Sequence, residues 1–87
     1  MKIVYHRTFL KHFKKRIAPN PKLQARFYQR LNLLIRQPNH PLLRKHRLKG
    51  KKRFYWSFAV TGDIRVIYRI EGKTLYLYDI GTHAQVY

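Results

Sequence analysis

The first 37 residues show two different spacings of apolar side chains. Residues 1–6 have the alternation typical of a short strand, whereas apolar side chains recur every three or four positions from Thr8 to Ile17. The second spacing predicts an amphipathic helix, and Thr8 is the candidate N-cap. The apolar stripe of this helix consists of Phe9, Leu10, Phe13 and Ile17.

A second helix is predicted directly after Pro19-Asn20-Pro21. Asn20 is the candidate N-cap, and Pro21 suits the first helical position, where its missing N–H would have no partner. The helix should end near Gln37, because the residue before a proline avoids the helical conformation. The stripe predicted to be buried consists of Leu23, Phe27, Leu31 and Leu34, widened by Tyr28 and Ile35.

Beyond the loop at residues 38–41 the apolar spacing changes to two. In residues 54–60 the even positions are large and apolar, so they are expected to face the helices. Two further strands are predicted over residues 64–70 and 74–80. The turns between the three strands are Thr61-Gly62-Asp63 and Glu71-Gly72.

These elements predict a single domain over residues 1–87. Short hairpins make the meander of three or four strands antiparallel, and the two helices should cover one of its faces. The expected fold class is therefore α+β, in the order β-α-α-β-β-β. The opposite face of the sheet should be open, with side chains from odd positions that include Tyr55, Ser57, Arg65 and Arg69.

The charge of the chain points to the class of partner. Twenty Lys and Arg residues accompany only Asp63, Glu71 and Asp79, which gives a formal net charge of +17. Charge of one sign at this density destabilises a compact state, so a polyanion is expected to bind: nucleic acid first, an anionic membrane second. The chain has no cysteine and no long apolar stretch, so we expect a cytoplasmic location.

Candidate chemistry comes from histidines and cations. His46 and His83 each lie near a turn glycine, whereas His6, His12 and His40 are expected to be ordinary surface residues. No cofactor or metal is expected, because no phosphate-binding glycine loop and no convincing ligand cluster are present. RNA can be cut by its own 2′-hydroxyl if a base, an acid and cations are supplied, which His, Arg and Lys can do. DNA lacks that hydroxyl, so RNA is the preferred target.

Several motifs resemble one family over essentially the whole chain. The stretches Gly62–Ile70 and Ile80–Tyr87, in the β-α-α-β-β-β order, are similar to the RelE/ParE toxin superfamily of bacterial toxin–antitoxin modules. The motifs His46-x-Leu48-x-Gly50 and Gly81-Thr82-His83 are similar to its branch of RelE/YafQ-like messenger-RNA interferases. The resemblance implies a RelE-like fold.

The resemblance also implies an activity and roles for residues. It implies a ribosome-dependent endoribonuclease that cuts messenger RNA in the decoding site and is silenced by a cognate antitoxin. The implied acid–base pair is His46 and His83, with Asp63 orienting or assisting. The resemblance further implies that Arg65 contacts the phosphate and that Tyr87 stacks on or positions a nucleotide. An acidic antitoxin segment would also relieve the self-repulsion of the toxin.

The basic residues divide into two sets. One set lies on the predicted helices and would bind ribosomal RNA. The other set, on the sheet and turns, would hold the strand being cut; it includes Lys49, Lys51, Lys52, Arg53 and Arg69. The chain departs from YafQ-like members at Ala59, where they carry a further histidine four residues before the aspartate.

Two other functions fit the same fold or charge. A ParE-like inhibitor of DNA gyrase shares the fold but not the chemistry, and the combination of His46, Asp63 and His83 counts against it. A non-catalytic RNA-binding protein would bind tightly and with strong salt sensitivity, yet leave the RNA uncut.

Overall fold

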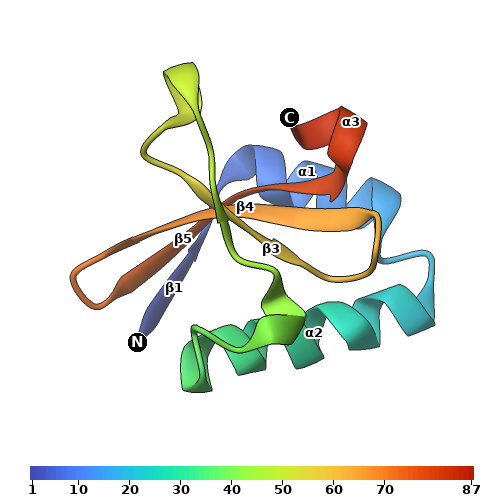
Figure 1. Cartoon of the computed structure of the whole chain (residues 1–87). Helices are drawn as coiled ribbons and strands as arrows, with labels where there is room; N and C mark the ends of the chain where they lie inside the picture. Colours follow the sequence, from blue (N-terminus) through green and yellow to red (C-terminus); the bar gives the residue numbers. More distant parts are fainter.

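A computed structural model describes residues 1–87 and shows a five-stranded sheet in the order β1-β5-β4-β3-β2 (Figure 1). The helix α2 lies on one side of this sheet and the short helix α3 on the other. The elements are β1 (Lys2–Tyr5), α1 (Arg7–Arg16), α2 (Pro21–Arg36), the 3₁₀ turn η1 (Pro41–Leu43), β2 (His46–Arg47), the 3₁₀ turn η2 (Gly50–Lys52), β3 (Trp56–Ala59), β4 (Ile64–Glu71), β5 (Thr74–Thr82) and α3 (His83–Val86).

The meander β3-β4-β5 is antiparallel, as predicted. The sheet as a whole is mixed, because β1 pairs in parallel with β5. The two helices between β1 and the meander supply the long crossover that a parallel pair requires. A strand of two residues, β2, extends the other edge by pairing with β3, and it is too short to leave a periodic signal in the sequence.

The ends of the helices follow local hydrogen bonding. Asn20 caps α2 and Pro21 is its first residue, both as predicted, and the helix ends at Arg36 with Gln37 as its C-cap. In α1 the predicted cap is wrong by two residues. The imidazole of His6 accepts a hydrogen bond from the backbone N–H of Thr8 at 3.2 Å, so His6 is the N-cap and Thr8 lies in the first turn. None of the helices combines the length and apolarity that crossing a membrane requires.

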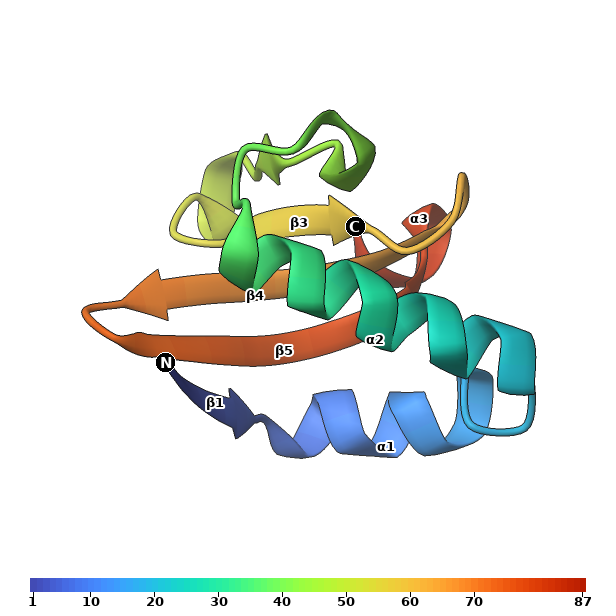
Figure 2. The ribbon, with the colours of Figure 1, turned by 90° about the horizontal axis from the view of Figure 1, so that it is seen from below.

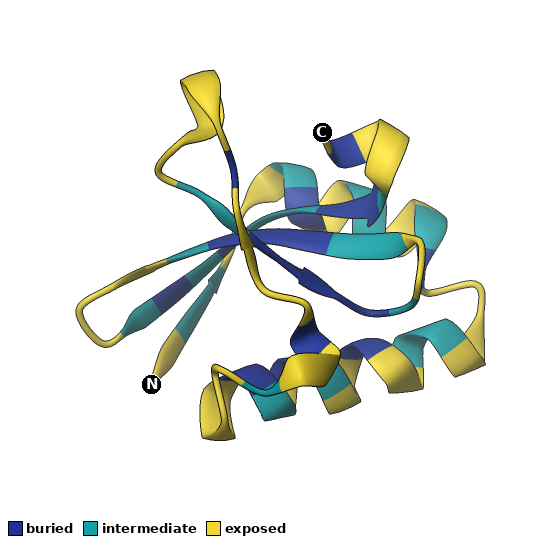
Figure 3. Ribbon diagram, in the orientation of Figure 1, coloured by how far each residue is buried: buried dark blue, intermediate teal, exposed yellow.

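The main core lies between the helices and one face of the sheet. Figure 2 shows α2 crossing that face while α1 runs on from β1 beside β5. Phe9, Phe27 and Phe58 belong to this core of thirteen buried residues, and buried positions alternate with exposed ones along both helices (Figure 3). The apolar stripes are narrower than predicted, since large side chains remain exposed at Leu10, Tyr28 and Ile35. Phe54 is also exposed, because β3 begins only at Trp56.

The opposite face of the sheet is not fully open, contrary to the prediction. α3 folds back over it, and Leu48, Ile67 and Val86 form a second small core there. α3 follows β5 without a loop, because β5 continues to Thr82, two residues past the predicted end. A register shift between β4 and β5, with Tyr78 as the extra residue, interrupts the alternation of β5. The side chains that face α3 are therefore partly covered.

Candidate functional site

One pocket brings together four of the residues predicted from sequence. It has a volume of about 390 Å³ and opens beside α3, at the end of the sheet where β5 becomes that helix. Its lining comes from β2, β4, α3 and the chain just before β2. The lining residues are Arg44, Lys45, His46, Arg65, His83 and Tyr87.

Strand register explains why these residues converge. His46 pairs with Ser57 across β2 and β3, and Arg65 pairs with Ala59 across β3 and β4. Directly opposed residues project on the same face, and Ser57 and Ala59 are two apart on one strand, so all four share a face. Arg65 also pairs with Gly81 of β5, two residues before His83. The register thus places an imidazole from each side around the Arg65 guanidinium.

Tyr87 completes the pocket. Its ring lies edge-on to the imidazole of His83, with centroids 4.1 Å apart and planes at 84°. Its hydroxyl hydrogen-bonds the hydroxyl of Ser57, which is fully buried in β3. Sequence reasoning did not assign a role to Ser57 beyond the sheet face. The structure shows that it anchors the last residue of the chain.

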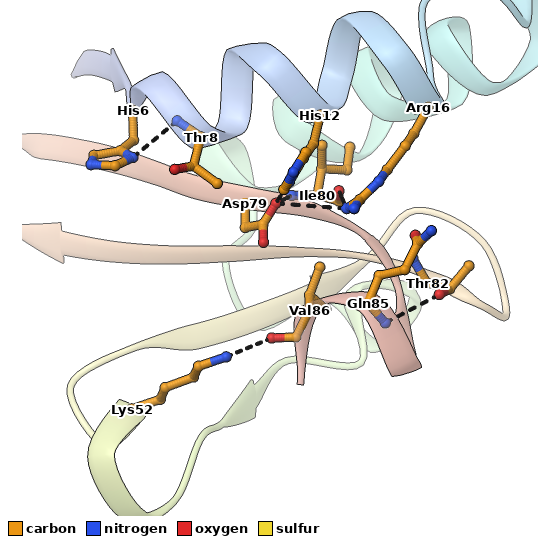
Figure 4. Close-up of polar contacts among 10 residues, drawn as sticks. All are labelled: His6, Thr8, His12, Arg16, Lys52, Asp79, Ile80, Thr82, Gln85 and Val86. Carbon is orange, nitrogen blue, oxygen red and sulfur yellow. Dashed lines mark hydrogen bonds and ion pairs between the residues drawn. The ribbon is translucent and has the colours of Figure 1, made fainter.

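α3 is fastened at both of its ends. Thr82 and Gln85 form a reciprocal capping box at its N-terminus, with the Gln85 side chain accepting from the Thr82 N–H at 2.8 Å. At the other end, Lys52 Nζ donates a hydrogen bond of 2.9 Å to the carbonyl of Val86 (Figure 4). The capping box is a sequence signal for this helix that the spacing of apolar residues does not carry. Lys52, an exposed residue that is also predicted to contact RNA, therefore supports α3.

A polar link ties α1 to the end of β5. His12 Nδ1 lies 2.5 Å from the carboxylate of Asp79, and Arg16 donates to the carbonyl of Ile80 at 2.9 Å (Figure 4). Gly81 leaves room for this arginine, because a Cβ there would lie 2.6 Å from Arg16 Nη1. His12 is therefore half-buried and paired, not an ordinary surface residue as predicted.

The other predicted site residues lie outside this pocket. Asp63 is exposed in the turn before β4, and no side-chain hydrogen bond or ion pair involves its carboxylate. Lys49 and Lys51 are exposed on or beside η2, the segment that projects from the body in Figure 1. Arg53 and Arg69 line a different pocket. The structure thus separates the predicted RNA contacts from the four residues that converge.

The electrostatics of the pocket favour an anion. Arg44, Lys45 and Arg65 have no carboxylate partner, because the ion pairs of the molecule involve only Asp79 and Glu71. The Nε of Arg65 is buried without a hydrogen-bond partner. A guanidinium that is neither neutralised nor fully hydrogen-bonded can bind a phosphate through charge-assisted hydrogen bonds. No three or more His, Asp or Glu side chains in the chain are grouped so that they could hold a metal ion.

Comparison with known proteins identifies relatives along the whole chain. A family model described as a bacterial toxin of type II toxin–antitoxin system, YafQ, matches residues 1–87. The crystal structure of YafQ from E. coli strain BL21(DE3) is 24% identical, with a TM-score of 0.85, and the match covers 99% of this chain and 97% of that one. A search of curated proteins gave no match.

Two further solved structures share the architecture. YafQ in the E. coli DinJ–YafQ complex is 25% identical, with a TM-score of 0.83 and coverage of 99% and 97% of the two chains. A YoeB/ParE toxin from Agrobacterium tumefaciens is 22% identical, with a TM-score of 0.81 and coverage of 95% and 99%. The predicted α+β, RelE/ParE-like fold is thereby confirmed.

Proposed function

Because the chain belongs to the YafQ family of bacterial toxins of type II toxin–antitoxin systems, we propose that it is a ribosome-dependent endoribonuclease that cuts messenger RNA. The observation that carries this proposal is the convergence of His46, Arg65, His83 and Tyr87 on one pocket. Two imidazoles, a guanidinium without a carboxylate partner and a phenol are a sufficient set of groups for cutting RNA without a protein nucleophile.

The proposed reaction uses the 2′-hydroxyl of the RNA as the nucleophile. One histidine removes the 2′ proton, and the 2′ oxygen attacks the adjacent phosphorus. The bond from phosphorus to the 5′ oxygen breaks, and the other histidine gives that oxygen a proton. The products are a 2′,3′-cyclic phosphate and a 5′-hydroxyl. His46 and His83 fill the two roles, because histidine can act as acid or base near neutral pH.

Arg65 and Tyr87 contribute to the same cleavage step without transferring a proton. The guanidinium of Arg65 stabilises the negative charge that builds up on the phosphate oxygens in the transition state. The ring of Tyr87 positions a nucleotide, and it is held in place by its contacts with His83 and Ser57. Both contacts lie within the protein itself, so they preorganise the ring for that task.

The remaining predicted residues hold the substrate outside the pocket. Asp63, at the end of the sheet where Ile64 pairs with Thr82, assists or orients from the rim. Lys49, Lys51 and Lys52 contact the RNA backbone from the projecting η2 segment, with Arg53 and Arg69 further along the sheet. Ala59 is a buried neighbour of Arg65 where related toxins carry a histidine, so the chemistry here relies on two histidines and the cations.

Two macromolecular partners belong to this proposal. The E. coli YafQ structure with DinJ is that of a toxin–antitoxin complex. By analogy, an acidic antitoxin segment binds this chain, whose net charge of +17 it would offset. The basic faces of α1 and α2 bind ribosomal RNA and bring the pocket to ribosome-bound messenger RNA. No small-molecule cofactor takes part in the proposed reaction.

A primer-extension assay on messenger RNA in a translation extract tests the proposal. We expect new 5′ ends when the wild-type protein is added with ribosomes, and none when ribosomes are removed. The variant His83→Asn should lose cleavage at least about 100-fold, since general acid–base groups contribute roughly that much or more. His40→Asn is the matched control, because His40 caps η1 away from the pocket and asparagine is also a capping residue.

The outcomes separate the competing functions. Equal cleavage by His83→Asn and wild type would contradict the proposed acid–base pair. Tight RNA binding without any new 5′ end would favour a non-catalytic binding protein. Intact translation accompanied by double-strand DNA breaks would favour a gyrase inhibitor.

A further inference from the structure

A second and larger pocket lies on the other side of the edge strand β2. Its volume is about 440 Å³, and its walls include Lys45, Arg47, Arg53, Phe54 and Trp56. His46 and Arg47 are neighbours on β2, so their side chains point to opposite faces of the sheet. His46 lines the pocket proposed for cleavage and Arg47 lines the larger one, so this short strand separates the two pockets.

The walls of the larger pocket combine accessible aromatic rings with cations. Phe54 is 56% exposed, and the guanidinium of Arg53 lies 4.6 Å from its ring centroid. Trp56 is half-buried, with the ammonium of Lys45 5.0 Å from its ring centroid. Proteins that hold unpaired nucleotides use this combination: bases stack on aromatic rings while cations contact the phosphates.

The charge of the larger pocket favours a phosphate-bearing ligand. Glu71 is the only acid in its lining, and it is paired with Arg69 at 3.0 Å. Lys45, Arg47 and Arg53 have no carboxylate partner. A purely apolar peptide segment would leave these three cations without a negatively charged partner. A nucleotide offers a base that can stack on the rings and a phosphate that can pair with the cations.

The two pockets lie on either side of β2 and share one lining residue, Lys45. A strand held in the pocket with His46 and His83 therefore meets the larger pocket where it crosses the exposed edge at β2. We propose that the larger pocket is a subsite for an unpaired nucleotide of the strand that is cut, next to the cleaved position. Its base stacks on Phe54 and Trp56, and its phosphates contact Lys45, Arg47 and Arg53. This proposal rests on the proposed function for the identity of the strand.

Tryptophan fluorescence tests the subsite directly, because Trp56 is the only tryptophan of the chain. The probe is a short single-stranded oligoadenylate, titrated against the folded protein while emission and the anisotropy of a label on the RNA are both recorded. We expect saturable quenching of Trp56 emission that follows the binding curve. A duplex of the same length, whose bases are paired, should bind through charge but leave the emission unchanged.

A matched pair of variants isolates the contribution of stacking. Phe54→Leu keeps the charge and removes a ring from the subsite, and it should weaken oligoadenylate binding about fivefold or more. Tyr28→Leu removes a ring from the outer surface of α2, where Tyr28 is 50% exposed, and should leave the affinity unchanged. Thermal unfolding of both variants checks that each is folded.

Three results would overturn the subsite: no oligoadenylate binding, binding without any change in Trp56 emission, or equal affinities for Phe54→Leu and Tyr28→Leu. The cleavage assay distinguishes this failure from failure of the proposed function. If RNA quenches Trp56 emission but the wild-type protein does not cut RNA, the subsite is supported and the proposed endoribonuclease activity is contradicted. If the protein cuts RNA but RNA does not quench Trp56 emission, the endoribonuclease activity is supported and the subsite is contradicted.

Discussion

The buried hydroxyl of Ser57 has one side-chain partner, the hydroxyl of Tyr87. This single contact joins the last residue of the chain to the central part of the sheet. It also keeps the Tyr87 ring against His83, where the proposed function needs it. A buried polar group that loses its partner costs more free energy than the bond itself contributes.

Tyr87→Phe removes only a hydroxyl group, yet it should destabilise the protein clearly. We expect the free energy of unfolding to fall by about 1–3 kcal/mol, because the hydroxyl of Ser57 would remain buried and unpaired. Adding Ser57→Ala to that variant should restore part of the loss. Urea unfolding of both single variants and the double variant measures this. Losses that simply add in the double variant would show that the hydroxyls do not interact.

The side chains that line the pocket could be predicted from the sequence, whereas the residues that hold them in place could not. His46, Arg65, His83 and Tyr87 carry side chains with recognisable chemistry, and the resemblance to related toxins pointed to them. The support by Lys52 could not be predicted, because a lysine that donates to a carbonyl looks like any other lysine in a basic run. The roles of His6 and His12 likewise depend on which atoms the fold brings near their rings.

At the scale of elements, α3 is the part of the fold that joins the sheet to the pocket. It begins where β5 ends. The Arg16 side chain of α1 lies against Gly81 near that junction and hydrogen-bonds the carbonyl of Ile80. The arginine, the glycine and the capping box of α3 occupy one small volume, since a Cβ on Gly81 would also lie 2.7 Å from Gln85 Oε1. The absence of a side chain at Gly81 thus lets Arg16 of α1 and Gln85 of α3 both lie close to the end of β5.

Gly81→Ala should disturb this junction. The added methyl group displaces the Arg16 guanidinium and the Gln85 side chain, and we expect a loss of about 1–3 kcal/mol in the free energy of unfolding. The end of the Arg16 side chain can move away, but the added Cβ would also lie 3.2 Å from Gln85 Cβ, which cannot. Cleavage should fall as well, because α3 carries His83.

Gly62→Ala is the control for that variant, since nothing lies within 4 Å of a Cβ at Gly62. Urea unfolding and primer extension on both variants give the comparison. If Gly81→Ala matched Gly62→Ala in stability and cleavage, the tight junction would not govern the position of α3.

The long elements could be predicted because their spacing persists over several turns or pairs. α2 shows this best, with a cap, a first-turn proline and a stop before Pro38 that all agree with the structure. β2 has two residues and α3 has a single helical turn, so neither leaves a periodic signal. The parallel pairing of β1 with β5 is a contact between distant parts of the chain, which local spacing does not encode.

At the scale of the whole molecule, one sign of charge dominates. The formal net charge is +17, and only two of the three acids take part in ion pairs. The cations are spread over both helices, the projecting η2 segment and the two pockets. The folded chain therefore repels itself, and a polyanion that binds it also relieves that repulsion.

Salt should act on stability and on RNA binding in opposite directions. Raising the concentration of sodium chloride shortens the range of repulsion between the cations, so the free energy of unfolding should rise. The same change should weaken binding to RNA, because counterions released on association gain less free energy when they enter a more concentrated salt solution. Urea unfolding and anisotropy titrations across one salt series measure both. A free energy of unfolding that is flat or falling with salt would contradict the proposed self-repulsion.

In the proposed reaction, the pocket of His46, Arg65, His83 and Tyr87 cuts RNA through the 2′-hydroxyl of the RNA itself. The most direct measurement uses a ribosome-bound messenger RNA with a single 2′-deoxy substitution at the cleaved nucleotide, compared with the unmodified strand. We predict that the unmodified strand yields a 2′,3′-cyclic phosphate and a 5′-hydroxyl, and that the substituted strand stays intact at that position. Equal cleavage of the two strands would contradict attack by the 2′-hydroxyl.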